Sequence, residues 1–232
     1  MLSQKRILVC PLDWGLGHAT RCVPVIRLLL QHNAEVIIAG DGSSLELLKK
    51  EFPQLKFLFL KGYNISYPKN ENMILKMMFS APKILSRIII EHQTLKKIIK
   101  QNNIDVVISD NRYGLWNKEI KSIFITHQLM IKTPFAEKLL HDLVLFFVSK
   151  YDECWVPDVE TENNLSGDLA HRYPVLKNTF FVGLLSRFKT VQKINLYKYD
   201  VLAIVSGPEP QRSIFEKTVI VWDLSTSRMG MP

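Results

Sequence analysis

The sequence predicts an α/β fold in which a doubly wound parallel sheet carries helices on both faces. Two observations support this prediction. Short apolar runs alternate along the chain with longer segments of helical periodicity, as in consecutive βαβ units. Polar residues and glycines directly follow several of these runs, at the positions where open parallel sheets bind ligands.

The expected elements follow one another without an internal repeat. The predicted helices cover residues 19–32, 43–51, 71–101 and 135–150, and Pro82 is expected to interrupt the third. Ser43 or Ser44 is expected to cap the second helix, because serine is favoured at that position. A further strand-like run covers residues 218–224. The predicted strands cover residues 6–11, 35–39, 56–60, 105–109, 122–126, 153–156, 180–183 and 201–206.

Length and composition narrow the class of protein. The chain has 232 residues, of which 47% are hydrophobic, enough for one large domain or two small ones. Its cysteines, Cys10, Cys22 and Cys154, include no C-x-x-C pair, so neither a disulfide framework nor a zinc ribbon is expected. The N-terminus lacks a signal-peptide layout, and charges interrupt the apolar runs well before ~20 residues. We therefore expect a cytoplasmic protein without a transmembrane helix.

The formal net charge of +8 comes from lysines and arginines that are scattered along the chain. Scattered charge favours a basic solvated surface, and phosphorylated ligands or anionic lipid are the alternative partners. Nucleic acid is not expected, because no basic stripe alternates with aromatic residues.

We expect two domains of unequal completeness. The first covers residues 1–185, a polar and basic linker covers 186–199, and residues 200–232 begin a second α/β domain. A complete second domain of this kind would need on the order of 100 residues. The second domain is therefore expected to be truncated.

The turn at residues 13–18 is the strongest functional signal. Gly15 and Gly17 lie between the first predicted strand and helix, where backbone N–H groups can bind an anion, and His18 adds an acid–base group. The pattern matches the dinucleotide motif G-x-G-x-x-G only in part, because Thr20 occupies the third position. Asp41 after the second strand keeps a nicotinamide-binding interpretation open. The turn can also serve helix–strand packing alone.

Three further polar positions are expected at the same edge of the sheet. Arg21 lies one helical turn beyond His18 and can bind phosphate or pair with a surface acid. Asp110 follows a strand and can orient His18, hold a sugar hydroxyl or form an Asx turn, and His127 closes the next strand. The predicted catalytic residues are His18 and Asp110. The predicted acceptor- or phosphate-binding residues are Gly15, Gly17, Arg21, Asn111, Arg112 and His127.

Residues 73–90 combine many apolar side chains with Lys76, Lys83 and Arg87. This composition is typical of core packing. The alternative is a shallow surface that contacts an anionic membrane, with the basic residues facing the lipid headgroups.

Five segments in order, residues 13–21, 109–114, 126–128, 154–158 and 183–188, resemble bacterial GT-B glycosyltransferases. The chain is most similar to MurG-like proteins of glycosyltransferase family 28, over about residues 5–217. The resemblance implies two Rossmann-like domains facing across a cleft. The N-terminal domain would bind the acceptor and the C-terminal domain a nucleotide-sugar, usually a UDP-sugar, with no metal or other cofactor. By position, His18 matches a loop histidine that can deprotonate the acceptor hydroxyl.

The resemblance also implies what the second domain contributes. Ser206, Gly207 and Arg212 resemble the first donor-binding loop, but the later donor residues have no counterpart here. The chain is therefore expected to be inactive alone, because transfer requires both substrates to be positioned. The alternatives are a non-catalytic acceptor-binding subunit that pairs with a donor-domain partner chain, and a nicotinamide-binding Rossmann protein. The expected partners are a nucleotide-sugar, a sugar or lipid-linked acceptor, and the inner face of the membrane as a peripheral contact.

Overall fold

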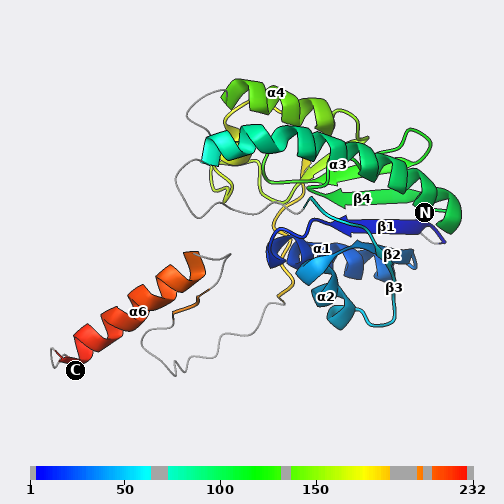
Figure 1. The fold of residues 1–232 in the computed structure, drawn as a ribbon. Helices are drawn as coiled ribbons and strands as arrows, with labels where there is room; N and C mark the ends of the chain where they lie inside the picture. The colour runs from blue at the N-terminus through cyan, green and yellow to red at the C-terminus, as the bar shows by residue number, and fades with distance from the viewer. Residues whose placement is uncertain (1–3, 64–72, 132–136, 189–202, 206–210, 229–232) are drawn as a thin grey trace. The chain divides into compact units, whose positions relative to one another are not determined.

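The computed structural model describes residues 4–63, 73–131, 137–188, 203–205 and 211–228 (Figure 1). The chain divides into two units, each described by itself. The first spans residues 1–66 and 72–187 and contains the sheet. The second spans residues 67–71 and 188–232, and its described part includes helix α6, Gln211–Arg228.

The first unit is built on a sheet of seven strands, which pair in parallel in the order β3-β2-β1-β4-β5-β6-β7. In the centre, Ile7 of β1 pairs with Val36 of β2 on one side and with Val106 of β4 on the other. The strand order reverses direction after β1, which is where ligands bind in sheets of this type. The strands are β1 Arg6–Pro11, β2 Glu35–Gly40, β3 Lys56–Phe59, β4 Val106–Asp110, β5 Lys121–Ile125, β6 Glu153–Val156 and β7 Thr179–Phe181.

Helices cover both faces of this sheet, so the predicted doubly wound α/β fold is confirmed (Figure 1). Ile7 and Val9 of β1 face one core with α1 and α2, whereas Leu8 and Cys10 face a second core with α3. The alternation of side chains along each strand therefore places apolar residues on both faces. A third cluster packs α4 against β5 and β6. The helices of this unit are α1 Leu16–Gln31, α2 Gly42–Glu51, α3 Met73–Asn102, α4 Glu137–Val148 and α5 Asp168–His171.

Three predicted elements differ from the structure. Helix α3 continues through Pro82, since the apolar periodicity on both sides outweighs the lost N–H. The strand-like run 218–224 lies within α6, because a helix satisfies its own backbone groups whereas a strand needs a neighbour. Residues 203–205 of the predicted strand 201–206 are not in a strand, and its other residues lie outside the described part. Helix α5 was not predicted; its four residues are too short for a periodic signal.

Helix α2 is not capped by its own serines, so that prediction was wrong. Instead, the Asp13 carboxylate accepts hydrogen bonds from the Ser44 N–H (3.0 Å) and the Ser43 hydroxyl (2.9 Å). Gly42 has φ 57°, and a Cβ there would collide with the Asp13 carboxylate. Asp13, the first residue of the glycine turn, is thereby hydrogen-bonded to the N-terminus of α2.

The apolar segment of α3 is divided between core and surface. Ile88 is buried, whereas Leu85, Ile89 and Ile90 are exposed. The side chains of residues 73–81 lie outside the described part. In the described ranges, no helix is long and apolar enough to cross a membrane.

Candidate functional site

Three loops meet at the carboxyl edge of the sheet. The glycine turn follows β1, Asp110 ends β4, and Thr126 and His127 follow β5. The strands β1, β4 and β5 are neighbours, and Asp110 is in register with Pro11 on one side and Ile125 on the other. The topology thus gathers the polar residues that the sequence distributes over more than one hundred positions.

The glycine turn leaves open space at the start of α1. Gly15 has φ 86°, a conformation that side-chain-bearing residues rarely adopt, and α1 begins at the next residue. Apart from the neighbouring residues and the local helix backbone, no atom of the described residues lies within 4 Å of a Cβ added at Gly15 or Gly17. Packing of the helix against the sheet therefore does not explain the glycine at position 17. Glycine within a helix lowers its stability, so another reason for it is expected. The absence of a side chain here suits close approach of a ligand to the backbone.

Asp110 is the centre of the site. Its side chain is fully buried, and its oxygens accept hydrogen bonds from Nε of Arg21 (2.6 Å) and from Nη2 of Arg21. The Cys22 thiol lies 3.6 Å from the same carboxylate. Burial acts to raise the pKa of Asp110, but the Arg21 guanidinium and the hydrogen bonds from Arg21 and His18 lower it below its ordinary value. The carboxylate is therefore ionised at neutral pH.

His18 lies against this carboxylate and has an 11% exposed side chain. Its Nδ1 is 2.9 Å from Oδ1 of Asp110 and 2.6 Å from Nη2 of Arg21. We assign the ring proton to Nδ1, because an unprotonated Nδ1 would turn its lone pair toward a buried carboxylate, whereas Arg21 Nη2 already donates to Asp110. Nε2 of His18 then carries the lone pair. This is the arrangement of a general base oriented by a carboxylate.

His127 contacts the same guanidinium from the other side. Nη1 of Arg21 lies 2.6 Å from Nδ1 of His127, whose ring is half-buried. Burial is the largest cause that lowers the pKa of His127, and the charges of Arg21 and His18 add to it. His127 is thus held as a neutral imidazole next to His18.

Asn111 supports these loops. Its carboxamide oxygen accepts a hydrogen bond from the Thr126 hydroxyl (3.1 Å), and the same hydroxyl oxygen accepts the N–H of Gln128 (2.9 Å). Asn111 has φ 57°, which reverses the chain directly after β4. Thr126 thus links the β4 and β5 loops, a role that its type and position alone did not suggest.

Arg112 does not join the site, contrary to the prediction that it binds an acceptor. Its guanidinium is fully buried, with Nε 2.7 Å from Glu91 and Nη2 donating to the backbone carbonyls of Leu60 and Lys61. The left-handed turn at Asn111 directs the next side chain into the core instead of toward the edge. The sequence signal that could have indicated this buried pair is Glu91, a single acidic residue within an apolar helical segment.

The predicted donor-binding residues are not placed at this site. Ser206 and Gly207 lie outside the described residues, and Arg212 lies in α6 of the second unit. Within the described ranges, no cluster of three or more histidine, cysteine or acidic side chains could hold a metal ion. Burial raises the pKa of the Cys10 and Cys154 thiols to about 12, so these two thiols are protonated at neutral pH.

Comparison with known proteins adds a curated relative and solved structures, whereas no family model matches the chain. An uncharacterized glycosyltransferase of Methanosarcina mazei is 24% identical over 238 residues, covering 92% of this chain. The chain spans about 60% of that relative's length.

Solved structures show the fold. The crystal structure of Arabidopsis thaliana UGT89C1 complexed with quercetin matches with a TM-score of 0.52 and 15% identity, over 93% of this chain and 56% of that one. The chain thus has the Rossmann-like fold of GT-B glycosyltransferase structures. Acinetobacter baumannii MurG matches with a TM-score of only 0.42 over 68% of this chain and 42% of that one, so the MurG-like subgroup stays a prediction.

Proposed function

We propose that this chain is the acceptor-binding part of a GT-B glycosyltransferase. The observation that carries the proposal is the oriented His18–Asp110 pair at the carboxyl edge of the sheet, next to a glycine turn with open space. The fold match and the similarity to a glycosyltransferase of M. mazei support the same reaction class.

The proposed reaction is direct transfer of a sugar from a nucleotide-sugar, with UDP as the expected nucleotide. Nε2 of His18 takes the proton of an acceptor hydroxyl while that oxygen attacks the anomeric carbon of the donor. The bond between this carbon and the diphosphate oxygen breaks, and the nucleotide diphosphate leaves with the electron pair. Asp110 keeps the proton on Nδ1 of His18 and stabilises the imidazolium that forms.

We further propose that transfer needs a donor-binding domain beyond the residues of the first unit. The site in the first unit is proposed to supply the base and the acceptor surface, and the chain spans about 60% of the length of the M. mazei relative. Without a donor held in place, the base has no reaction to accelerate. The chain alone is therefore expected to show no turnover with UDP-glucose or UDP-N-acetylglucosamine.

The test is a transfer assay in which the chain is combined with a donor-binding domain and release of nucleotide diphosphate is measured against an acceptor panel. His18→Gln should lower turnover by ~10²-fold or more, because it removes the base. His32→Gln is the matched control, since His32 lies at the other end of the same helix and should leave turnover unchanged. Equal turnover of His18→Gln and wild type would contradict the catalytic role of His18.

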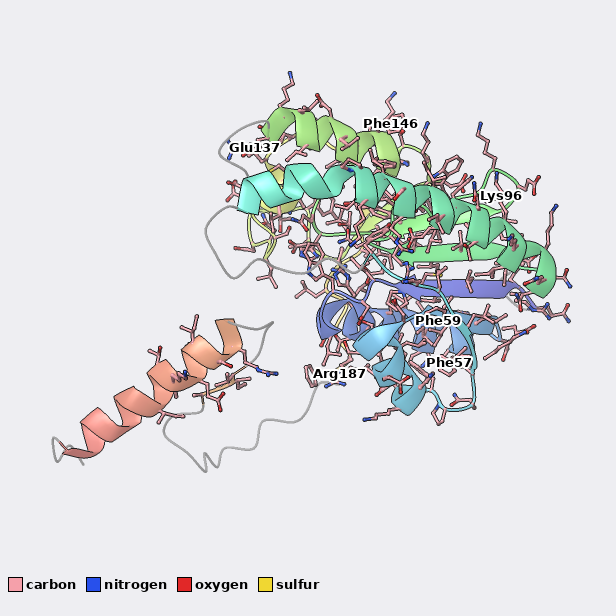
Figure 2. All side chains as sticks on the ribbon, viewed as in Figure 1. Phe57, Phe59, Lys96, Glu137, Phe146 and Arg187 are labelled. Atoms are coloured by element: carbon pink, nitrogen blue, oxygen red, sulfur yellow. The ribbon has the colours of Figure 1, made fainter. Side chains whose placement is uncertain are left out.

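We also propose a peripheral contact between α4 and an anionic membrane. Leu139, Leu143 and Phe146 are exposed and lie at helical spacing on α4. Figure 2 labels Phe146, and Nζ of Lys150 lies 4.3 Å from the centre of its ring. The chain should cosediment with phosphatidylglycerol vesicles, and Phe146→Glu should reduce the bound fraction severalfold. Equal binding of both proteins, or equal binding to phosphatidylcholine vesicles, would contradict the proposal.

A further inference from the structure

Two histidines of the candidate site share one cation. Arg21 donates through Nη1 to Nδ1 of His127 at 2.6 Å, and through Nε and Nη2 to the carboxylate of Asp110. Asp110 in turn faces Nδ1 of His18 at 2.9 Å. The same nitrogen, Nδ1, is therefore engaged in both imidazoles. In His127 it contacts the guanidinium of Arg21, and in His18 it contacts the Asp110 carboxylate as well as Nη2 of Arg21.

Chemistry fixes what each contact requires. A guanidinium group has only donors, so Nδ1 of His127 must be unprotonated, and a neutral ring then carries its proton on Nε2. Nδ1 of His18 lies near both an acceptor, Oδ1 of Asp110 at 2.9 Å, and a donor, Nη2 of Arg21 at 2.6 Å. Because an unprotonated Nδ1 would leave a lone pair facing the buried carboxylate, we assign the proton of His18 to Nδ1 and the lone pair to Nε2. The charged groups around His127 are Arg21, His18, Asp110 and Asp158, and Arg21 is the one in hydrogen-bond contact.

We propose that Arg21 and Asp110 hold His18 and His127 in opposite tautomers, so that His127 is a dedicated hydrogen-bond donor to the acceptor substrate. Nε2 of His18 accepts a proton from one hydroxyl, while Nε2–H of His127 donates to a second oxygen of the same molecule. The pair thus selects an acceptor whose reactive hydroxyl has a neighbouring oxygen, as in a sugar. Arg21 is the positioning residue. This ligand assignment rests on the proposed function, whereas the tautomers do not.

Nitrogen NMR of the chain labelled with ¹⁵N histidine tests the tautomers without any assay of activity. At about pH 8, above the ordinary histidine pKa, we expect protonated Nδ1 in His18 and protonated Nε2 in His127. His18→Gln and His127→Gln assign the signals. A protonated Nδ1 in His127 of the wild-type chain would overturn the proposal.

In Arg21→Met, no guanidinium fixes the tautomer of His127. The ¹⁵N chemical shifts of its two ring nitrogens should therefore average toward those of a free imidazole. Arg27→Met is the matched control, because Arg27 lies on the same helix but pairs with Glu51. Unchanged His127 signals in Arg21→Met would show that the arginine does not set the tautomer. If that variant fails to fold, Arg21→Lys keeps a donor and should preserve the protonated Nε2.

The role in substrate binding has its own readout, measured in the chain combined with a donor-binding domain. His127→Leu should raise the acceptor KM about tenfold with little change in kcat, the size expected for one lost hydrogen bond. His127→Gln keeps an N–H donor near the Nε2 position and should restore most of the affinity. Equal KM values for His127→Leu and wild type would reject substrate contact while leaving the tautomer result and the role of His18 standing.

Discussion

Two buried arginine–carboxylate pairs each include a residue at the end of β4 or in the loop after it, Asp110 in one and Arg112 in the other, and their surroundings differ. Arg21 and Asp110 are surrounded by His18, His127 and a thiol. Arg112 and Glu91 are surrounded by backbone carbonyls and tyrosine hydroxyls. The first pair faces two imidazoles, which can act as proton donors or acceptors, whereas the second faces backbone carbonyls and hydroxyls.

Exposure separates the two pairs as well. The Arg21 side chain is 11% exposed, as is that of His18, whereas the Arg112 and Glu91 side chains are 0% and 3% exposed. Burial raises the pKa of Glu91 above its ordinary value even though Arg112 and Tyr63 act to lower it. In Asp110 the balance is reversed and the pKa falls. A buried ion pair therefore points to function only when its remaining partners can titrate and reach the surface.

The largest expected effect is the loss of stability when the Arg112–Glu91 pair is broken. Arg112→Met leaves a deeply buried carboxylate and several carbonyls without their donor, and should lower the free energy of unfolding by about 3–5 kcal/mol. A loss of this size is a large part of the stability of a typical domain. Urea unfolding followed by tryptophan fluorescence measures it.

Arg172→Met is the control for Arg112→Met. Arg172 is 43% exposed and pairs with Glu137 at the surface, so the control should cost less than about 1 kcal/mol. Arg21→Met should fall between the two. Without the Arg21 charge, which lowers the pKa of His127, this histidine can take up a proton and partly replace the lost cation. Equal losses for Arg112→Met and Arg172→Met would remove the distinction between an enclosed and a solvated pair.

The sequence predicted the sheet and the meeting of the edge residues because both depend on local signals. The bounds of β1 and β6 match the predicted strands, since each is an apolar run that ends at a polar loop. His18, Arg21, Asp110 and His127 come together because the carboxyl ends of parallel strands share one edge. Their catalytic and binding roles stay predictions.

Other features depended on single backbone torsions or on distant partners and could not be predicted. The left-handed conformation of Asn111 turns Arg112 into the core, and asparagine allows that conformation without requiring it. Glu91 finds its partner 21 residues away, and Asp13 caps a helix 31 residues away. Residues 218–224 favour a strand by composition, but the neighbour that a strand needs is a property of the whole fold.

The smallest expected effect is on the pH dependence of stability, through proton binding at His127 beside the Arg21–Asp110 pair. The pKa of His127 is lowered in the folded chain, so between this pKa and the ordinary value near 6.5 the unfolded chain binds more protons. His127 therefore contributes stability that is complete above pH 6.5 and declines as the pH falls, by at most about 1.4 kcal/mol per pH unit. The physical causes are the burial of the ring and, after it, the Arg21 guanidinium, which a second proton on Nδ1 would face. Urea unfolding between pH 5 and 8 should show a shallower acid-side slope for His127→Gln than for wild type. Both proteins keep Glu91, whose raised pKa acts in the opposite direction, so the difference isolates His127. His32→Gln is the control substitution, because His32 is exposed. Parallel slopes of unfolding free energy against pH for wild type and His127→Gln would contradict a contribution of His127.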